Sequence, residues 1–238
     1  MHLGVEATFS HLDSGLDSVN WGKHQQMLQP PDLRAENRNV LLVRDPRDIC
    51  VSLYFEVFFR QLPAKSPAIV KERTRILNRF APPRSLDSFV RSETWGVPKV
   101  IRFQQLIEIA HTGGNSQKVF YEDLVTDPST ALTEILDYVG IRRSSKQVGN
   151  AIAECEFSKM KADEAHGSLD SKLGNAIGLV LADDPRSAKV REGLIGGHRN
   201  HLSHRTTKWA TKYLGKSRLP RYSDDEWLAT EESWAKWR

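Results

Sequence analysis

Short apolar runs alternate along the chain with longer stretches in which apolar residues recur at helical spacing. Three runs predict strands: Val5 to Ser10, Val40 to Val43 and Lys118 to Tyr121. The run at 40–43 has no polar position, which is typical of a strand buried on both faces. Strands that alternate with helical patterns predict an α/β fold, a single-domain parallel sheet flanked by helices.

A helix is predicted directly after the second strand. Asp45 can cap it, Pro46 suits its first position, and Asp48 adds negative charge to its first turn. The apolar positions that follow at helical spacing are Ile49, Leu53, Val57 and Phe58.

Further helices are predicted toward the C-terminus. Asp127-Pro128 repeats the start signal after the third strand, and Gly140 is a natural stop. Another helix is expected from Ser145 to about Cys155. The Trp-rich chain from Thr206 predicts helix packed over the domain, whose core we expect at about 7–203 with a tail at 204–238.

Composition fits a folded chain of 238 residues, because 39% are apolar and 27% charged. No apolar run approaches the roughly 18–20 residues that span a bilayer, and the first residues lack the pattern of a signal peptide. The net charge of +4 is too small to imply nucleic acid. Two distant cysteines argue against a disulfide framework or a zinc site and favour a reducing, cytoplasmic compartment.

The junction after the second strand is a candidate anion site. In a parallel sheet, ligands bind beyond the carboxyl ends of the strands, near helix N-termini. Arg44 lies at that strand end, and Ser52 lies on the second turn of the next helix. A guanidinium can bind a phosphate through two hydrogen bonds, and a hydroxyl adds another. The alternative is an ordinary junction in which Arg44 and Asp48 merely pair.

The segment Arg-Asp-Pro-Arg-Asp at 44–48, with Val-Ser at 51–52, resembles the 3′-phosphate-binding motif of sulfotransferases that use 3′-phosphoadenosine-5′-phosphosulfate (PAPS). Phe-Tyr-Glu-Asp-Leu at 120–124, Phe-Ser-Lys-Met-Lys at 157–161 and the glycine-rich segment 191–201 are similar to later family motifs, in the same order. The resemblance extends from about Ala7 to Ser203. It implies a P-loop NTPase-like fold and PAPS as co-substrate, without a metal.

This resemblance also implies which residues bind the nucleotide. Arg44 and Ser52 would hold the 3′-phosphate, while Arg191 and Gly193 would close over the nucleotide. The other implied nucleotide contacts are Tyr121, Cys155, Phe157, whose ring would stack on adenine, and Met160.

Two residues depart from the family pattern in the last motif. Glu192 stands where a Lys is usual, so it places an anion beside a polyanionic ligand and should weaken binding unless it faces solvent. His198 replaces the usual Trp, so a different packing of this segment is expected. His198, His201 and His204 are spaced by three, as metal ligands on a helix could be, but the preceding glycines and the family match favour adventitious metal binding at most.

The resemblance implies His11, after the first predicted strand, as the catalytic base; a surface histidine in a polar loop is the alternative. The family's phosphate loop, typically Pro-x-Ser-Gly-Thr-Thr-Trp, should precede that strand, and the sequence contains no such loop. We therefore expect an N-terminally truncated fold. Either Met1 is an internal methionine, or the chain is a degenerate member that binds nucleotide weakly or not at all.

The predicted function is transfer of a sulfuryl group from PAPS to a hydroxyl or amine of a small-molecule or glycan acceptor. Segment 61–91 is where acceptor specificity is expected. The alternative is a catalytically impaired or non-catalytic interaction protein on the same scaffold, with the Trp-rich tail as contact surface. A nucleotide kinase is disfavoured, because no Gly-x-x-x-x-Gly-Lys-Ser/Thr loop occurs.

Overall fold

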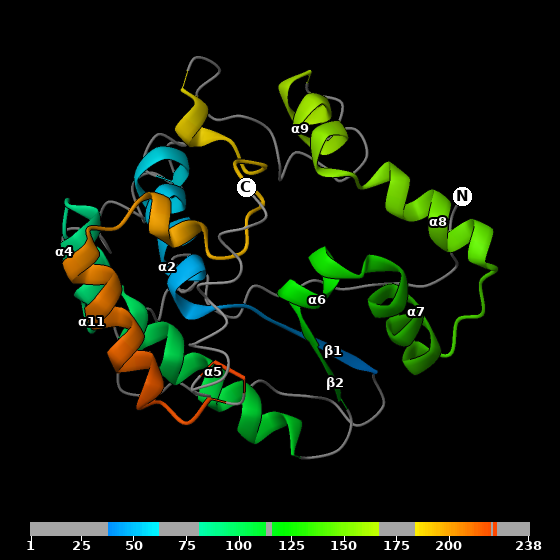
Figure 1. The fold of residues 1–238 in the computed structure, drawn as a ribbon, viewed down its shortest axis with the longest axis horizontal. Helices are drawn as coiled ribbons and strands as arrows, with labels where there is room; N and C mark the ends of the chain where they lie inside the picture. Colours follow the sequence, from blue (N-terminus) through cyan, green and yellow to red (C-terminus); the bar gives the residue numbers. More distant parts are fainter. Residues whose placement is uncertain (1–37, 62–80, 113–115, 167–183, 220, 223–238) are drawn as a thin grey trace, which may run out of the picture.

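The computed structural model describes residues 38–61, 81–112, 116–166, 184–219 and 221–222. Within these ranges, β1 (Asn39–Val43) and β2 (Ser116–Phe120) pair in parallel. The predicted parallel sheet flanked by helices is confirmed (Figure 1). The predicted strand at 5–10, His11 and most of segment 61–91 lie outside the described residues.

Helices surround this sheet in two groups (Figure 1). One group, with α2, α4, α5 and α11, packs together beside β1, and α6, α7, α8 and α9 follow β2 on the other side. The bounds are α2 (Pro46–Phe55), the π-helical turn η1 (Glu56–Gln61), α4 (Leu86–Arg91), α5 (Val97–His111), α6 (Tyr121–Thr126), α7 (Pro128–Val139), α8 (Ser145–Glu154), α9 (Phe157–Ala165), the 3₁₀ turns η2 (Pro185–Ser187) and η3 (Gly197–Asn200), and α11 (His204–Gly215).

The predicted helix ends are confirmed where local capping chemistry determines them. Asp45 caps α2 by accepting the N–H of Arg47, and Pro46 is the first helical residue. Asp127 caps α7, which ends at Gly140 in the left-handed conformation with φ of 79°. The helix expected from Ser145 to Cys155 is α8, and it begins with a capping box that the preceding Ser144 forms with Gln147.

The core lies between β1 and the helices α2, α4, α5 and α11. Its largest fully buried apolar side chains include Phe89, Trp95 and Leu214. From β1, Leu41 and Val43 point into this core. The core therefore fixes the carboxyl end of β1 and the start of α2, which is the junction that carries Arg44.

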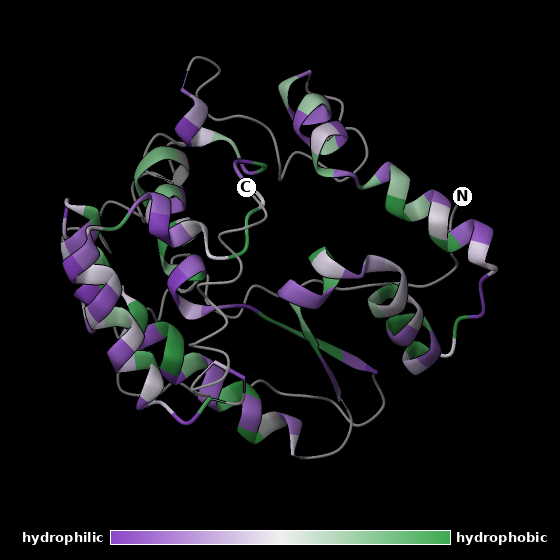
Figure 2. Cartoon of the chain, viewed as in Figure 1, coloured by the Kyte–Doolittle hydropathy of each residue, from purple (hydrophilic) through white to green (hydrophobic). Residues whose placement is uncertain are grey.

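The prediction that β1 is buried on both faces is wrong. Val40 and Leu42 alternate with the buried positions and are 40% and 57% exposed, although β1 is hydrophobic along most of its length (Figure 2). An uninterrupted apolar run does not say how many faces are covered. Among the described elements, β2 is the strand paired with β1, and α7 packs against β2.

The third predicted strand also ends one residue earlier than expected, because Tyr121 begins α6. Tyr121 therefore lies at the carboxyl end of β2, beside the carboxyl end of β1. None of the helices in the described ranges is long and apolar enough to cross a membrane.

Candidate functional site

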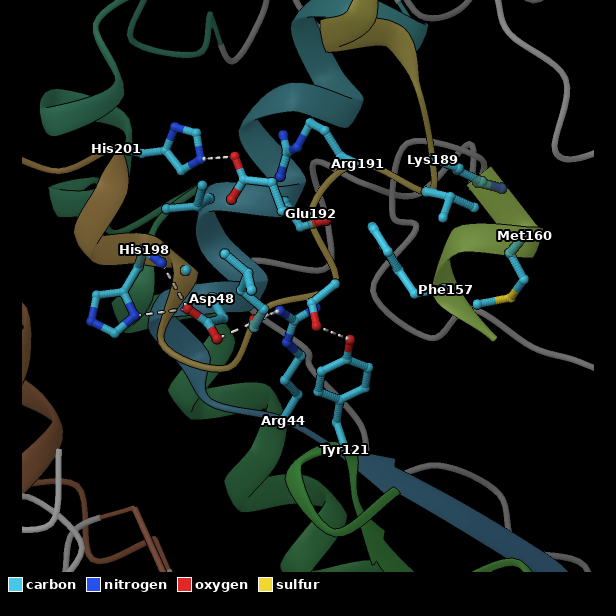
Figure 3. Close-up of a pocket in the computed structure, with 16 residues that line it drawn as sticks. Arg44, Asp48, Tyr121, Phe157, Met160, Lys189, Arg191, Glu192, His198 and His201 are labelled. Atoms are coloured by element: carbon cyan, nitrogen blue, oxygen red, sulfur yellow. Dashed lines mark hydrogen bonds and ion pairs between the residues drawn. The ribbon is translucent and has the colours of Figure 1, made fainter. Parts of the chain in front are cut away.

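A pocket of about 260 Å³ lies at the carboxyl ends of the two strands. It is bordered by the first turns of α2, by residues 188–198 (called loop 188–198 below), by His201 and by the start of α9 (Figure 3). Seven of the eight nucleotide contacts implied by the sequence line it: Arg44, Ser52, Tyr121, Phe157, Met160, Arg191 and Gly193. The fold thus brings together residues that span almost 150 positions of sequence.

The eighth residue, Cys155, is not among those that line the pocket. It is exposed at the C-cap of α8, in the turn before Phe157 opens α9. The structure therefore gives no support to Cys155 as a nucleotide contact, because α9 rather than the end of α8 borders the pocket.

Arg44 leaves the end of β1 and reaches across to loop 188–198. Its Nη2 donates to the carbonyl of Leu194 at 3.0 Å, and its guanidinium carbon lies 4.1 Å from the ring centroid of Tyr121. Asp48 is more distant, with 3.5 Å between Arg44 Nη2 and Asp48 Oδ2. Arg44 Nε is buried without a hydrogen-bond partner among the described residues. The simple Arg44–Asp48 pair considered from sequence is thus only one of several contacts that Arg44 makes, and its hydrogen bond is longer than that to Leu194.

Tyr121 joins the two strand ends to the same loop. Its hydroxyl donates to the carbonyl of Gly193 at 3.2 Å. Burial raises the pKa of Tyr121, although the charge of Arg44 opposes this. The side chain therefore remains a neutral phenol and can act as a donor.

Arg191 places a second guanidinium in the pocket. Its guanidinium carbon lies 3.7 Å from the ring centroid of Phe55, on the last turn of α2. Burial lowers the pKa of Arg191; Glu192 opposes this shift and the nearby charge of Arg44 adds to it. Nε and Nη1 of Arg191 are buried without a hydrogen-bond partner in the described part of the chain. Two half-buried guanidiniums whose buried donors lack partners in the described part of the chain are typical of a site that binds an anion.

Asp48 anchors the C-terminal end of loop 188–198. Its carboxylate accepts the backbone N–H of Gly196 at 2.8 Å and that of His198 at 2.9 Å, and it lies 2.7 Å from Nδ1 of His198. From sequence, Asp48 was expected only as a first-turn charge and as an alternative partner of Arg44. His198, which stands where the resemblance implies a Trp, is buried, and its ring bonds to this carboxylate.

Glu164 anchors the N-terminal end of loop 188–198. It is buried on α9, and its two carboxylate oxygens accept the N–H groups of Lys189 and Val190 at 2.7 and 2.8 Å. Nothing in the sequence around Glu164 indicates this role, because its partners lie 25 and 26 positions away. Two buried carboxylates, one at each end, therefore hold the segment that carries Arg191 and Gly193.

Gly193 allows a close approach between this loop and α9. Its φ is 65°, in the left-handed region, and a Cβ at this position would lie 2.5 and 2.6 Å from two ring carbons of Phe157. The resemblance implies a glycine that admits a phosphate; the structure adds that the glycine also makes room for the Phe157 ring.

The three evenly spaced histidines do not share one helical face. His198 belongs to η3, His201 is the C-cap of η3, and His204 is the first residue of α11. His201 Nε2 lies 2.8 Å from Oε1 of Glu192. Within the described ranges, no group of three or more His, Cys, Asp or Glu side chains could hold a metal ion.

A family model for the sulfotransferase domain matches residues 15–220. The sequence has no significant match among curated proteins. The fold resembles retinol dehydratase solved with androsterone and the inactive cofactor PAP (21% identity, TM-score 0.51, 76% of this chain and 49% of that chain). It also resembles a mouse sulfotransferase, SULT7A1, complexed with PAP (16% identity, TM-score 0.52, 83% of this chain and 62% of that chain).

A second retinol dehydratase structure, in a complex with retinol and PAP, gives 20% identity and a TM-score of 0.52 over 76% of this chain and 47% of that one. The likeness at these identities is one of fold. The chain spans about half the length of the retinol dehydratase chains and less than two thirds of the mouse chain.

Proposed function

The chain belongs to the sulfotransferase domain family, and we propose that it is an enzyme that transfers a sulfuryl group from PAPS to a hydroxyl or amine acceptor. The observation that carries the proposal is the pair of guanidiniums, Arg44 and Arg191, which line one pocket and have buried donors without hydrogen-bond partners among the described residues. Leaving such donors unsatisfied is costly, and a phosphate is the group whose geometry suits them.

The lining of the pocket fits a nucleotide with a 3′-phosphate. Arg44, Arg191 and the exposed hydroxyl residue Ser52 would hold the phosphate, and Phe157 and Met160 offer an aromatic and a thioether surface for the adenine. PAPS supplies the sulfuryl group when bound. The described residues would bind and orient the nucleotide end, so that the acceptor meets the sulfur in line.

The remaining roles rest on the resemblance. His11 is proposed as the base that takes the proton of the acceptor. Small-molecule acceptors are proposed because the retinol dehydratase structures carry androsterone and retinol. A reducing, cytoplasmic compartment is proposed because both cysteines are free, Cys50 in the core and Cys155 on the surface.

The first test is calorimetric titration of the purified chain with adenosine 3′,5′-bisphosphate (PAP). Arg44→Ala and Arg191→Ala should each weaken binding about 10- to 100-fold, the loss of one charge-assisted contact. Arg102→Ala is the matched control, because Arg102 pairs with Glu93 on the surface. Absence of PAP binding in the unmodified chain would overturn the nucleotide assignment.

The second test separates an enzyme from a binding protein. Radiolabelled PAPS is incubated with a panel of phenols, alcohols and amines, and labelled product is counted for the unmodified chain and for His11→Ala. Product that His11→Ala abolishes supports the proposal. PAP binding without product for any acceptor would favour the non-catalytic alternative.

A further inference from the structure

Glu192 is an acidic residue at the edge of a pocket that the proposed function fills with a polyanion. It follows Arg191 directly and lines the same pocket. Its side chain is 32% exposed, so solvent shields its charge only in part. An unopposed carboxylate here would repel the nucleotide, and it could also pair with the free donors of Arg191.

His201 contacts this carboxylate directly. Its Nε2 lies 2.8 Å from Oε1 of Glu192, and its side chain is 21% exposed (Figure 3). An ionised carboxylate has no proton to give, so the hydrogen in this contact lies on Nε2 of the imidazole. The contact offsets the charge of Glu192 and occupies one of its oxygens.

The position of His201 follows from two other contacts. His201 is the C-cap of η3, and Asp48 fixes η3 by accepting the N–H groups of Gly196 and His198. The ring of Phe55 meets His201 edge to face, with centroids 5.3 Å apart, while Arg191 stacks on the same ring. The aromatic ring of Phe55 thus contacts both Arg191 and His201, the two side chains that flank Glu192.

We propose that His201 is a positioning residue that holds the Glu192 carboxylate away from the anion site and offsets its charge, so that a nucleotide can bind beside Arg191. This inference rests on the proposed function. It concerns a feature in which the chain departs from its family, since a lysine is usual at the position of Glu192. His201 also lines the pocket, but in the proposed role it acts on the nucleotide through Glu192.

A double-mutant cycle tests the dependence on Glu192, with PAP affinity measured by calorimetry. His201→Ala should weaken binding about 10-fold, the usual size of one charge-assisted contact. Glu192→Gln should leave affinity unchanged or raise it, and the double variant should remain within about 2-fold of Glu192→Gln. An equal loss from His201→Ala in both backgrounds would mean a purely structural role and would overturn the inference.

Two further variants serve as controls for the double-mutant cycle. His204→Ala removes an exposed imidazole three positions away, outside the pocket lining, and should not change affinity. His201→Gln keeps an N–H donor and a similar size, so it serves if His201→Ala fails to fold. It should give a loss smaller than that of alanine, again only when Glu192 is present.

A readout without nucleotide distinguishes failure of this inference from failure of the proposed function. The His201 imidazole is followed by NMR, with its signals assigned by comparison with His201→Ala. Glu192→Gln should shift the imidazole signals at constant pH, because the group 2.8 Å from Nε2 changes from a carboxyl to an amide. No shift would overturn the pair. If the pair forms but PAP does not bind, the proposed function fails. The double-mutant cycle is then repeated with inorganic pyrophosphate. A loss from His201→Ala that depends on Glu192 supports the inference, and a loss that does not depend on Glu192 overturns it.

Discussion

The Asp48 carboxylate bonds to His198 twice, accepting its backbone N–H at 2.9 Å and lying 2.7 Å from its ring Nδ1. The two residues are 150 positions apart, and both side chains are buried. Because the same carboxylate also accepts the N–H of Gly196, one side chain on the first turn of α2 determines where loop 188–198 ends. The position of Arg191 in this loop therefore depends on a residue 143 positions earlier in the chain.

Asp48→Asn should lower both stability and nucleotide affinity. An amide offers one acceptor oxygen in place of two, and its NH₂ would face a backbone N–H. We expect a loss of about 2–3 kcal/mol in unfolding free energy, measured by urea denaturation, and at least a 10-fold weaker PAP titration. Asp137→Asn, at an exposed site on α7, should change neither. Unaltered affinity in a folded Asp48→Asn protein would contradict the anchoring role.

Glu164→Gln should loosen the other end of the loop. One of the two hydrogen bonds from Lys189 and Val190 loses its acceptor, so the unfolding free energy should fall by about 1–3 kcal/mol. Hydrogen exchange of the amides of Lys189 and Val190 should quicken while that of the α5 amides does not. Exposed Glu134→Gln on α7 is the control. Unchanged protection of both loop amides would refute the anchor.

The contacts of Asp48 and Glu164 with loop 188–198 could not be predicted from the sequence. Helix starts at Asp45 and Asp127 and the stop at Gly140 were predictable, because capping depends on residues a few positions apart. Asp48 and Glu164 accept bonds from residues 25 to 150 positions away, and no local pattern records such a pairing. Their roles follow only once the fold brings those segments together.

The burial of β1 and the contacts around the pocket also depend on segments that are distant in sequence. Leu42 belongs to an apolar run but is exposed, because the number of faces covered depends on the neighbouring elements rather than on the run itself. Seven residues that the resemblance implies as nucleotide contacts line one pocket. The resemblance did not include Phe55, whose contact with Arg191 depends on how α2 meets loop 188–198.

Gly193→Ala should disrupt the pocket more than other glycine substitutions. The added methyl would lie 2.5 Å from the Phe157 ring, and the φ of 65° disfavours any side chain. Gly140→Ala carries the φ cost alone, since nothing lies within 4 Å of its Cβ position. Gly149→Ala, in α8 with open space, should stabilise by about 0.5–1 kcal/mol. PAP affinity should fall only for Gly193→Ala; a loss of similar size for Gly140→Ala would rule out the contact with Phe157 as the cause.

Acid should destabilise the fold through Asp45. Burial raises the pKa of this carboxyl, but the charge and hydrogen bonds of Arg47 outweigh burial and bring it to about 2, from an ordinary 3.8. A pKa that is lower in the folded chain means that the contribution of Asp45 is complete above about pH 4 and is lost as the pH falls toward 2. The difference corresponds to about 2 kcal/mol.

Glu122 works in the opposite direction and must be separated from Asp45. Burial raises the pKa of Glu122, so its contribution to stability grows as the pH falls and is lost as the pH rises through the folded value. Asp45→Asn keeps an N-cap residue for α2 but removes the charge beside Arg47. The slope of unfolding free energy between pH 4 and pH 2, measured by urea denaturation, should therefore be flatter in Asp45→Asn than in the unmodified chain and in Glu122→Gln. An Asp45→Asn slope as steep as that of the unmodified chain would show that other carboxylates carry the acid sensitivity.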